Sequence, residues 1–267
     1  MTQRSIWKGH LKVAQVICPV ALYAAASTSD RVTFHTINRA TGNRVQRDFI
    51  DSETGKPVAR DDQAKGYEVA PDTFVVLEPD ELAAAVPDSD KTLNVRSFIA
   101  CGAVDGVYFD KPYFLAPQDA DSAEAFVLLR DGMRSAEVAA LAQTVLFRRL
   151  RTLLIRPHGT GLIGTTLHFD YEVRAATEVF ADMKKIKITG EMLDLAKHII
   201  VTKTGKFDPE TFDDRYDAAL ADLVKAKMAG RKIKPRAAPK VAKSTDLLAA
   251  LRESAKTAKP APKRKAG

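Results

Sequence analysis

Apolar and polar side chains alternate between Trp7 and Val13, near the start of the chain. Neighbouring side chains of a β-strand point to opposite faces, so this pattern is typical of a strand with one buried face. Similar short segments follow, separated by polar residues, Pro or Gly: 18–23, 32–34, 44–50, 73–77, 93–99 and 107–115. Short strands with frequent turns favour an all-β barrel or sandwich.

The next region continues this pattern less clearly. Val138–Phe147 is apolar enough for either a helix or a buried strand, whereas Thr152–Ile155 and Leu162–Phe169 are more typical of strands. Two helices are predicted among the strands, a short one that begins at Pro79 and a longer one over Ser122–Met133. The sequence therefore predicts a mainly β fold with some α-helix.

Two further helices are predicted between about residues 190 and 230. Glu191–Thr204 carries four apolar side chains at helical spacing and ends before Gly205. These four are Met192, Leu195, Ala196 and Ile199. The second helix has Asp208 as its N-cap and Pro209 in its first position, and its apolar stripe continues to Gly230. We expect this pair to pack against the barrel or against another subunit.

Residues 231–267 have a different composition, with 12 basic and 2 acidic side chains, four prolines and no aromatic residue. Such a segment buries too little apolar surface to fold alone, so we expect a disordered tail. One short helical motif is predicted within it, at 245–254, with Leu247, Leu248 and Leu251 on one face. A helix of this length is marginal in water, so it either folds on a partner or is an incidental Leu/Ala cluster.

Length and composition exclude several classes of protein. The 267 residues contain 45% hydrophobic side chains, enough for a substantial core, but no apolar run long enough to cross a membrane and no secretory signal. Cys18 and Cys101 are too few for a disulfide framework or a cysteine-based zinc site. We expect a soluble protein of the cytoplasm, with no membrane partner.

Several motifs resemble catalytic or cofactor sites but lack the required context. Residues 159–164 spell G-x-G-x-x-G, yet a strand rather than a helix is predicted after them, which favours a hairpin turn over a dinucleotide site. Pro57 stands where a phosphate loop needs Ser or Thr. The histidines and cysteines show no paired spacing. We therefore expect no enzyme activity, no catalytic residue, no metal and no cofactor.

The distribution of charge is more informative than the net value of +7. The segment from Arg31 to Arg47 contains four arginines and no acid, although residues 1–126 as a whole carry 13 basic and 18 acidic side chains. Two more basic clusters occur at Arg148–Arg151 and Lys184–Lys187. Together with the tail, these clusters favour a polyanion as partner. Few aromatic residues lie among the arginines, which suits the phosphates of a duplex better than stacked single strands.

Longer phrases of the sequence resemble the bacterial Ku proteins in order and spacing. The most specific is Tyr108–Pro117, which reads YFDKPYFLAP. Further matching phrases are Ile6–Gly9, Pro19–Tyr23, Lys65–Glu68, Ala125–Arg130 and Phe207–Glu210. The similarity covers about residues 4–230, and the leucine motif of the tail resembles a short C-terminal motif of many members.

This resemblance implies a Ku core over residues 1–230, with a β-barrel and C-terminal helices. It implies an insertion, called the arm below, that runs from about residue 30 to about residue 80. Two subunits of such a homodimer join their arms into a ring that threads onto the ends of broken double-stranded DNA without regard to sequence. The family also recruits an ATP-dependent DNA ligase for non-homologous end joining, and it has no catalytic residues.

The resemblance also assigns candidate site residues. It places four arginines, Arg31, Arg39, Arg44 and Arg47, on the DNA-binding arm, and a second basic stretch with Arg148 and Arg149 facing the duplex. If 44–50 is a strand, Arg44 and Arg47 lie on opposite faces of it. In the tail, Lys263, Arg264 and Lys265 are further candidate DNA contacts, and Leu247, Leu248 and Leu251 are candidate ligase contacts.

Two alternatives remain open at this stage. One is a nucleoid-associated or regulatory protein that binds DNA non-specifically through its basic tail, and the other is an enzyme with an unrecognised site. Both as an end-joining protein and as a regulatory DNA-binding protein, it would be cytoplasmic and associated with the nucleoid.

Overall fold

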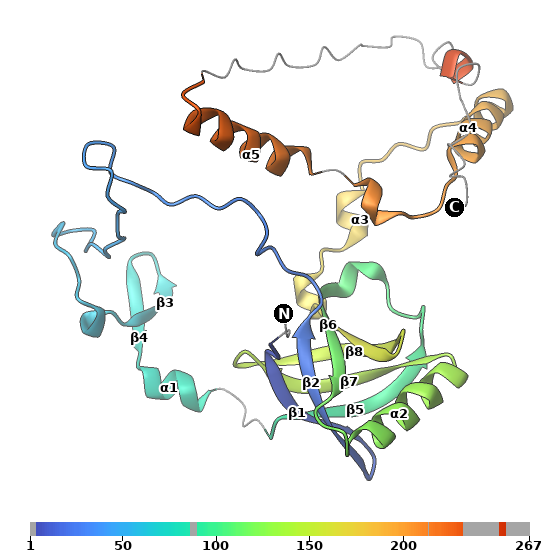
Figure 1. The fold of residues 1–267 in the computed structure, drawn as a ribbon, viewed down its shortest axis with the longest axis horizontal. Helices are drawn as coiled ribbons and strands as arrows, with labels where there is room; N and C mark the ends of the chain where they lie inside the picture. The colour runs from blue at the N-terminus through green and yellow to red at the C-terminus, as the bar shows by residue number, and fades with distance from the viewer. Residues whose placement is uncertain (1–3, 86–89, 213, 232–250, 255–267) are drawn as a thin grey trace. The chain divides into compact units, whose positions relative to one another are not determined.

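A computed structural model describes residues 4–85, 90–212, 214–231 and 251–254 (Figure 1). The chain divides into two compact units. The first unit comprises Met1–Asp30 with Phe34–Ala175, and the second comprises Arg31–Thr33 with Ala176–Gly267. None of the helices within the described ranges is long and apolar enough to cross a membrane.

The first unit contains a closed seven-stranded β-barrel, as the sequence predicts (Figure 1). Its strands are β1 (Trp7–Val13), β2 (Val16–Ala24), β5 (Thr92–Ala100), β6 (Phe109–Pro117), β7 (Val138–Leu146), β8 (Arg149–His158) and β9 (Gly161–Leu167). They are paired in the order β1-β2-β6-β9-β8-β7-β5. All neighbours are antiparallel except β1 and β5, whose short parallel pairing from His10↔Thr92 to Lys12↔Asn94 closes the barrel.

The alternation of the sequence is visible in the barrel interior. In β1, Gly9 and Leu11 are buried, whereas Lys8 before them and His10 between them are exposed. The ambiguous segment that begins at Val138 is a strand, because its buried positions recur every second residue rather than with helical spacing. Large side chains that are fully buried in the core come from all seven barrel strands and from α2 (Ala123–Ser135): Leu11, Leu22, Leu93, Leu115, Phe126, Leu146, Leu153 and Leu162.

Helix α2 packs against the barrel with Phe126 and Met133 buried. Ser122 and Asp119 form a reciprocal turn just before it: the Ser122 amide donates to Asp119 Oδ1 at 2.9 Å, and the Asp119 amide donates to Ser122 Oγ at 3.2 Å. The hydrogen bonds from Ser122 hold the pKa of the Asp119 carboxyl below its ordinary value. The predicted helix over Ser122–Met133 is confirmed, extended by two residues.

Two tight hairpins join the last three strands. The glycine-rich motif forms the turn between β8 and β9, with Gly159 at φ +53° and the pair His158↔Gly161 closing it. Because strand β9 follows directly, the prediction of a hairpin in place of a dinucleotide site is confirmed. Phe147 and Arg148 form the turn between β7 and β8, both with positive φ (52° and 65°), the backbone geometry of a type I′ turn.

The arm contains little regular structure. Its strands β3 (Lys65–Ala70) and β4 (Thr73–Leu77) form a separate two-stranded sheet. The other regular elements of this region are α1 (Pro79–Ala84) and a 3-10 turn, η1 (Arg60–Asp62). The strands predicted at 32–34 and 44–50 are wrong, since only the isolated bridges Ile37↔Arg44 and Ile50↔Pro57 form there. These segments have no neighbouring sheet among the described residues, and apart from the half-buried Val32 their alternating side chains remain exposed.

The described part of the second unit contains α3 (Ala176–Val179), α4 (Gly190–Lys203), α5 (Arg215–Met228) and a helical turn at 251–254. Helix α4 matches its prediction, and its four predicted apolar positions are half-buried. The prediction of one continuous helix after Asp208 is wrong, because Asp208 caps only the 3-10 turn η4 (Pro209–Thr211). A second N-cap, Asp214, accepts from the Asp217 amide at 3.0 Å and starts α5 anew.

Most of the tail lies outside the described residues. This holds for the predicted disorder of 232–250 and 255–267 and for five candidate contacts, Leu247, Leu248, Lys263, Arg264 and Lys265. Within the tail only residues 251–254 are described after Arg231, and they are helical, with Leu251 half-buried.

Candidate nucleic-acid interface

Three basic side chains of the arm meet at one cleft. Backbone hydrogen bonds from Val45 N to Thr36 O (3.2 Å) and from Asn38 N to Asn43 O (2.8 Å) fold the chain back on itself. The predicted turn is confirmed, with Gly42 at φ +73°. This fold lines a cleft of about 520 Å³ with His35, Thr36, Arg44, Val45 and Arg47.

Arg44 and Arg47 therefore lie at the same cleft. The expectation that they point to opposite faces is wrong, because it rested on a strand over 44–50 that does not form. Without a regular strand, residues three apart are not assigned to opposite faces. The sequence predicted these arginines as a group but not how they are arranged.

A second cleft, of about 430 Å³, shares Arg47 with the first. It also contains Arg60 from the 3-10 turn η1, along with Asp48 and Gln63. Sequence reasoning missed Arg60, because Asp61 and Asp62 follow it and make the local charge acidic. Arg60 could have been found by recognising the bridge Ile50↔Pro57, because this bridge returns the chain toward Arg47.

The arginines of the arm have free guanidinium groups. Within the described ranges, no carboxylate forms an ion pair with Arg31, Arg39, Arg44 or Arg47, and all four residues are exposed. An unpaired guanidinium presents its N–H donors in a planar fork that matches phosphate oxygens. These side chains are therefore available to an anionic ligand.

Two arginines of α2 behave differently. Arg130 pairs with Asp131 (Nε–Oδ1 2.8 Å) and donates to the Thr160 carbonyl at 2.6 Å, while Arg134 donates to the Gly159 carbonyl at 2.6 Å. The hydrogen bond to Asp131 raises the pKa of Arg130 and lowers that of Asp131. These two arginines tie α2 to the β8–β9 hairpin, so they are structural.

The other candidate residues do not line either cleft. Arg31 belongs to the second unit, where the Val32 amide donates to Asp217 Oδ1 of α5 at 3.0 Å. Arg39 occupies the turn of the arm. Arg148 lies in the β7–β8 turn and Arg149 begins β8, and both are exposed.

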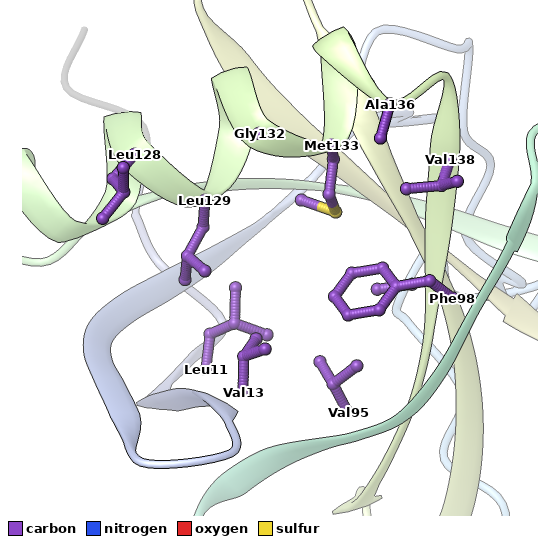
Figure 2. A pocket seen from close by; sticks show the side chains of 11 residues that line it. Leu11, Val13, Val95, Phe98, Leu128, Leu129, Gly132, Met133, Ala136 and Val138 are labelled. Atoms are coloured by element: carbon purple, nitrogen blue, oxygen red, sulfur yellow. The ribbon is translucent and has the colours of Figure 1, made fainter.

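An apolar pocket of about 510 Å³ lies between α2 and the strands β1, β5 and β7 (Figure 2). Leu129 and Met133 of α2 face Leu11, Val13 and Val95 across it. The side chains that line it carry carbon and a single sulfur, with no titratable group. It therefore offers no acid, base or nucleophile for catalysis.

A cluster of polar residues surrounds the end of β9. The Tyr108 hydroxyl donates to Asp170 Oδ1 at 3.1 Å, which raises the Tyr108 pKa, and His168 Nδ1 lies 3.5 Å from Glu172 Oε2. The backbone amide of Phe169 donates to the same Glu172 oxygen at 2.9 Å and lowers the pKa of that carboxyl. These contacts hold the 3-10 turn η3 (Asp170–Glu172) in place. In the described part of the chain, no three His, Cys, Asp or Glu side chains are grouped to hold a metal ion.

The first unit therefore has the architecture of a closed-barrel protein with a mostly irregular inserted arm, in which exposed arginines occur between residues 31 and 47 without any acidic residue. The family model described as the Ku70/Ku80 beta-barrel domain matches residues 12–195, well over half of the chain. The chain belongs to the Ku family, which confirms the resemblance seen in the sequence.

Three relatives show how far the similarity extends, and each is named "Non-homologous end joining protein Ku". The one from Cereibacter sphaeroides is 63% identical over 265 residues, covering 99% of both chains. The one from Bradyrhizobium sp. is 41% identical over 271 residues, covering 100% of this chain and 93% of the relative. The one from Methylocella silvestris is 36% identical over 269 residues, covering 98% and 99%.

Proposed function

We propose that the protein binds the ends of broken double-stranded DNA as a homodimeric ring, independent of sequence, in non-homologous end joining. The names of the relatives support the pathway. The ring and the preference for ends are what the Ku resemblance implies. The protein acts by binding, without a catalytic step or cofactor of its own.

The observation that carries this proposal is the set of unpaired arginines at the two clefts of the arm. Arg44 and Arg47 line one cleft with His35, and Arg47 lines the second with Arg60, so these side chains can contact several phosphates at once. Contacts to phosphate position a protein on DNA but carry no sequence information. This arrangement suits a protein that must accept any broken end.

Exposed apolar side chains of the arm support the homodimer. In the β3–β4 sheet, Phe74 is 57% exposed and Val75 is 49% exposed, although neighbouring residues of a strand point to opposite faces. Both faces of this two-stranded sheet are thus uncovered, and an isolated hairpin is marginally stable in water. We propose that a second copy of the arm covers it.

Recruitment of an ATP-dependent DNA ligase is proposed for the leucine motif of the tail. Leu247, Leu248 and Leu251 share one face of the predicted helix at 245–254. An amphipathic helix of this kind binds an apolar groove of its partner through residues at i and i+4. Substitution of Leu247 and Leu251 by Asp should impair ligase stimulation and leave DNA affinity unchanged.

The topology of binding gives the test of the proposed function. The protein is titrated with linear duplex and with covalently closed circular duplex of the same sequence in gel-shift assays. A ring loads only through an end, so we expect binding to the linear form and trapping when both ends are then blocked. Equal affinity for the two forms would overturn the proposal.

The basic tail favours a second candidate, a non-specific DNA-binding protein associated with the nucleoid. Its 12 basic side chains, which include Lys263, Arg264 and Lys265, could bind duplex without a ring. Deletion of residues 231–267 separates the two functions. End binding that survives with a shallower salt dependence supports the ring, whereas complete loss of binding supports the tail.

A further inference from the structure

The described part of the tail makes a specific contact within the second unit. Arg252 directs both Nε (3.1 Å) and Nη2 (2.5 Å) at Oε1 of Glu191, in the first turn of α4. Within residues 251–254, Leu251 is half-buried and the other three are exposed. The turn that carries one of the proposed ligase contacts is therefore held beside α4.

Glu191 is well suited to hold this arginine. It lies at the N-terminus of a helix of 14 residues, where the helix dipole stabilises a negative charge. The other carboxylate of this part of α4, Asp194, already pairs with Lys197 at 3.8 Å. Two guanidinium donors on one oxygen also fix the direction of approach better than a lysine would.

We propose that the first turn of α4 is the binding surface for the protein's own C-terminal motif. The Arg252–Glu191 pair, called the latch below, shelters Leu251 from the ligase. The inference rests on the proposed recruitment of a ligase by that motif. Both partners of the pair are about half exposed (54% and 57% of the side chain), and exposed pairs are weak. The latch is therefore open part of the time, and a partner that binds the leucines displaces it.

The latch changes ligase affinity by a predictable amount. A partner that binds only the open form has its affinity reduced by the fraction of chains that are open. We expect Glu191→Arg in the full-length protein to tighten ligase binding about 2- to 5-fold. The charge swap Glu191→Arg with Arg252→Glu should restore the affinity of the wild type. Glu210→Arg is the matched control, because it makes the same change of charge at an exposed position on η4.

A second measurement follows the latch without any ligase. A fluorophore is attached at Ala255→Cys in a Cys101→Ser background, since Cys101 is the exposed cysteine and Cys18 is buried. We expect its anisotropy to fall in Glu191→Arg, to recover in the charge swap and to be unchanged in Glu210→Arg. Anisotropy that is unaffected by Glu191→Arg would overturn the latch.

The two measurements separate this inference from the function on which it rests. Anisotropy that falls while ligase affinity stays constant would overturn the sheltering of Leu251. If anisotropy falls in Glu191→Arg but the wild-type protein binds no ligase, recruitment through the motif is overturned. The contact with α4 still stands in that case. A swap that restores both readouts supports the whole inference.

Discussion

The barrel and the arm use apolar side chains in opposite ways. All fully buried large side chains come from the barrel strands and α2, whereas none of residues 30–80 is buried. Apolar residues are nevertheless frequent in the arm, for example Phe49, Tyr67 and Phe74, each more than half exposed. The barrel thus obtains its stability from contacts within the chain, whereas the apolar side chains of the arm have no comparable contacts among the described residues. Folding and function can therefore be perturbed separately.

The largest expected effect is on the barrel. Leu153 is fully buried, so Leu153→Ala should lower the free energy of unfolding by about 2–5 kcal/mol through reduced burial and a residual cavity. Phe74→Ala in the arm is expected to change the stability of the barrel by less than about 0.5 kcal/mol. Urea unfolding followed by circular dichroism compares the two variants, and similar midpoints would contradict the division between barrel and arm.

The next effect concerns DNA and leaves the barrel intact. The double variant Arg44→Glu with Arg47→Glu should weaken end binding by on the order of 100-fold, because a hydrogen bond to a charged group contributes about 1.5–3 kcal/mol. Replacing both by Gln should also reduce the salt slope of log affinity by about 0.9 for each phosphate that is no longer neutralised. Gel shifts at several salt concentrations measure both quantities.

The control for this prediction is Arg156→Glu, an exposed reversal in β8 outside both clefts. It makes the same change of charge per site and should have a smaller effect.

Arg31→Glu with Arg39→Glu should abolish end binding with the dimer intact. A loss of the dimer in that variant would assign these residues to the subunit interface.

The proposed homodimer gives a third test. Phe74→Asp with Val76→Asp places two charges on one face of the β3–β4 sheet, where burial of each apolar side chain would contribute about 1.5–3 kcal/mol. We expect the dissociation constant of the dimer to rise at least tenfold, as measured by sedimentation, with the melting of the barrel unchanged. Leu128→Asp on α2 is the control, since Leu128 is exposed on the barrel. Equal dissociation in both variants would contradict the arm as the interface.

The smallest effect is a dependence of barrel stability on pH. The pKa of Asp119 is lowered in the folded state by hydrogen bonds from Ser122, so its contribution is present above the ordinary aspartate value of about 4. This contribution disappears as the pH falls through the lowered pKa. Asp119→Asn should therefore lose less stability than the wild type between about pH 4 and pH 2. Parallel curves of urea midpoint against pH would contradict this role.

The barrel was predicted well from the sequence because the apolar and polar positions of each strand reflect which of its side chains are buried. The alternation of Trp7–Val13 and the breaks at Pro and Gly reflect a core that the same chain supplies. Even Val138–Leu146, whose apolar composition left helix and strand open, has one correct solution once its neighbours β5 and β8 are known. Only the pairing order could not be read from local pattern.

The arm was predicted less well for the same reason. The alternation in 44–50 resembles a strand, but no neighbouring strand exists in the described part of this chain to pair with it. The clustering of Arg44 and Arg47 with Arg60 depends on two chain reversals, each with a single bridge, which leave almost no hydrophobic signal. In the second unit, the predicted helix is interrupted before Arg215. This interruption depends on a single capping carboxylate, that of Asp214, which stands in an acidic run.

The direct pairing of β1 with β5 has a consequence for how this architecture can vary. These strands pair directly from His10↔Thr92, so the barrel closes without a contribution from the chain between β2 and β5. The entropic cost of a longer insertion rises only logarithmically, by about 0.6 kcal/mol for each doubling. Insertions of quite different size could therefore be accommodated between β2 and β5 while the barrel itself stays unchanged.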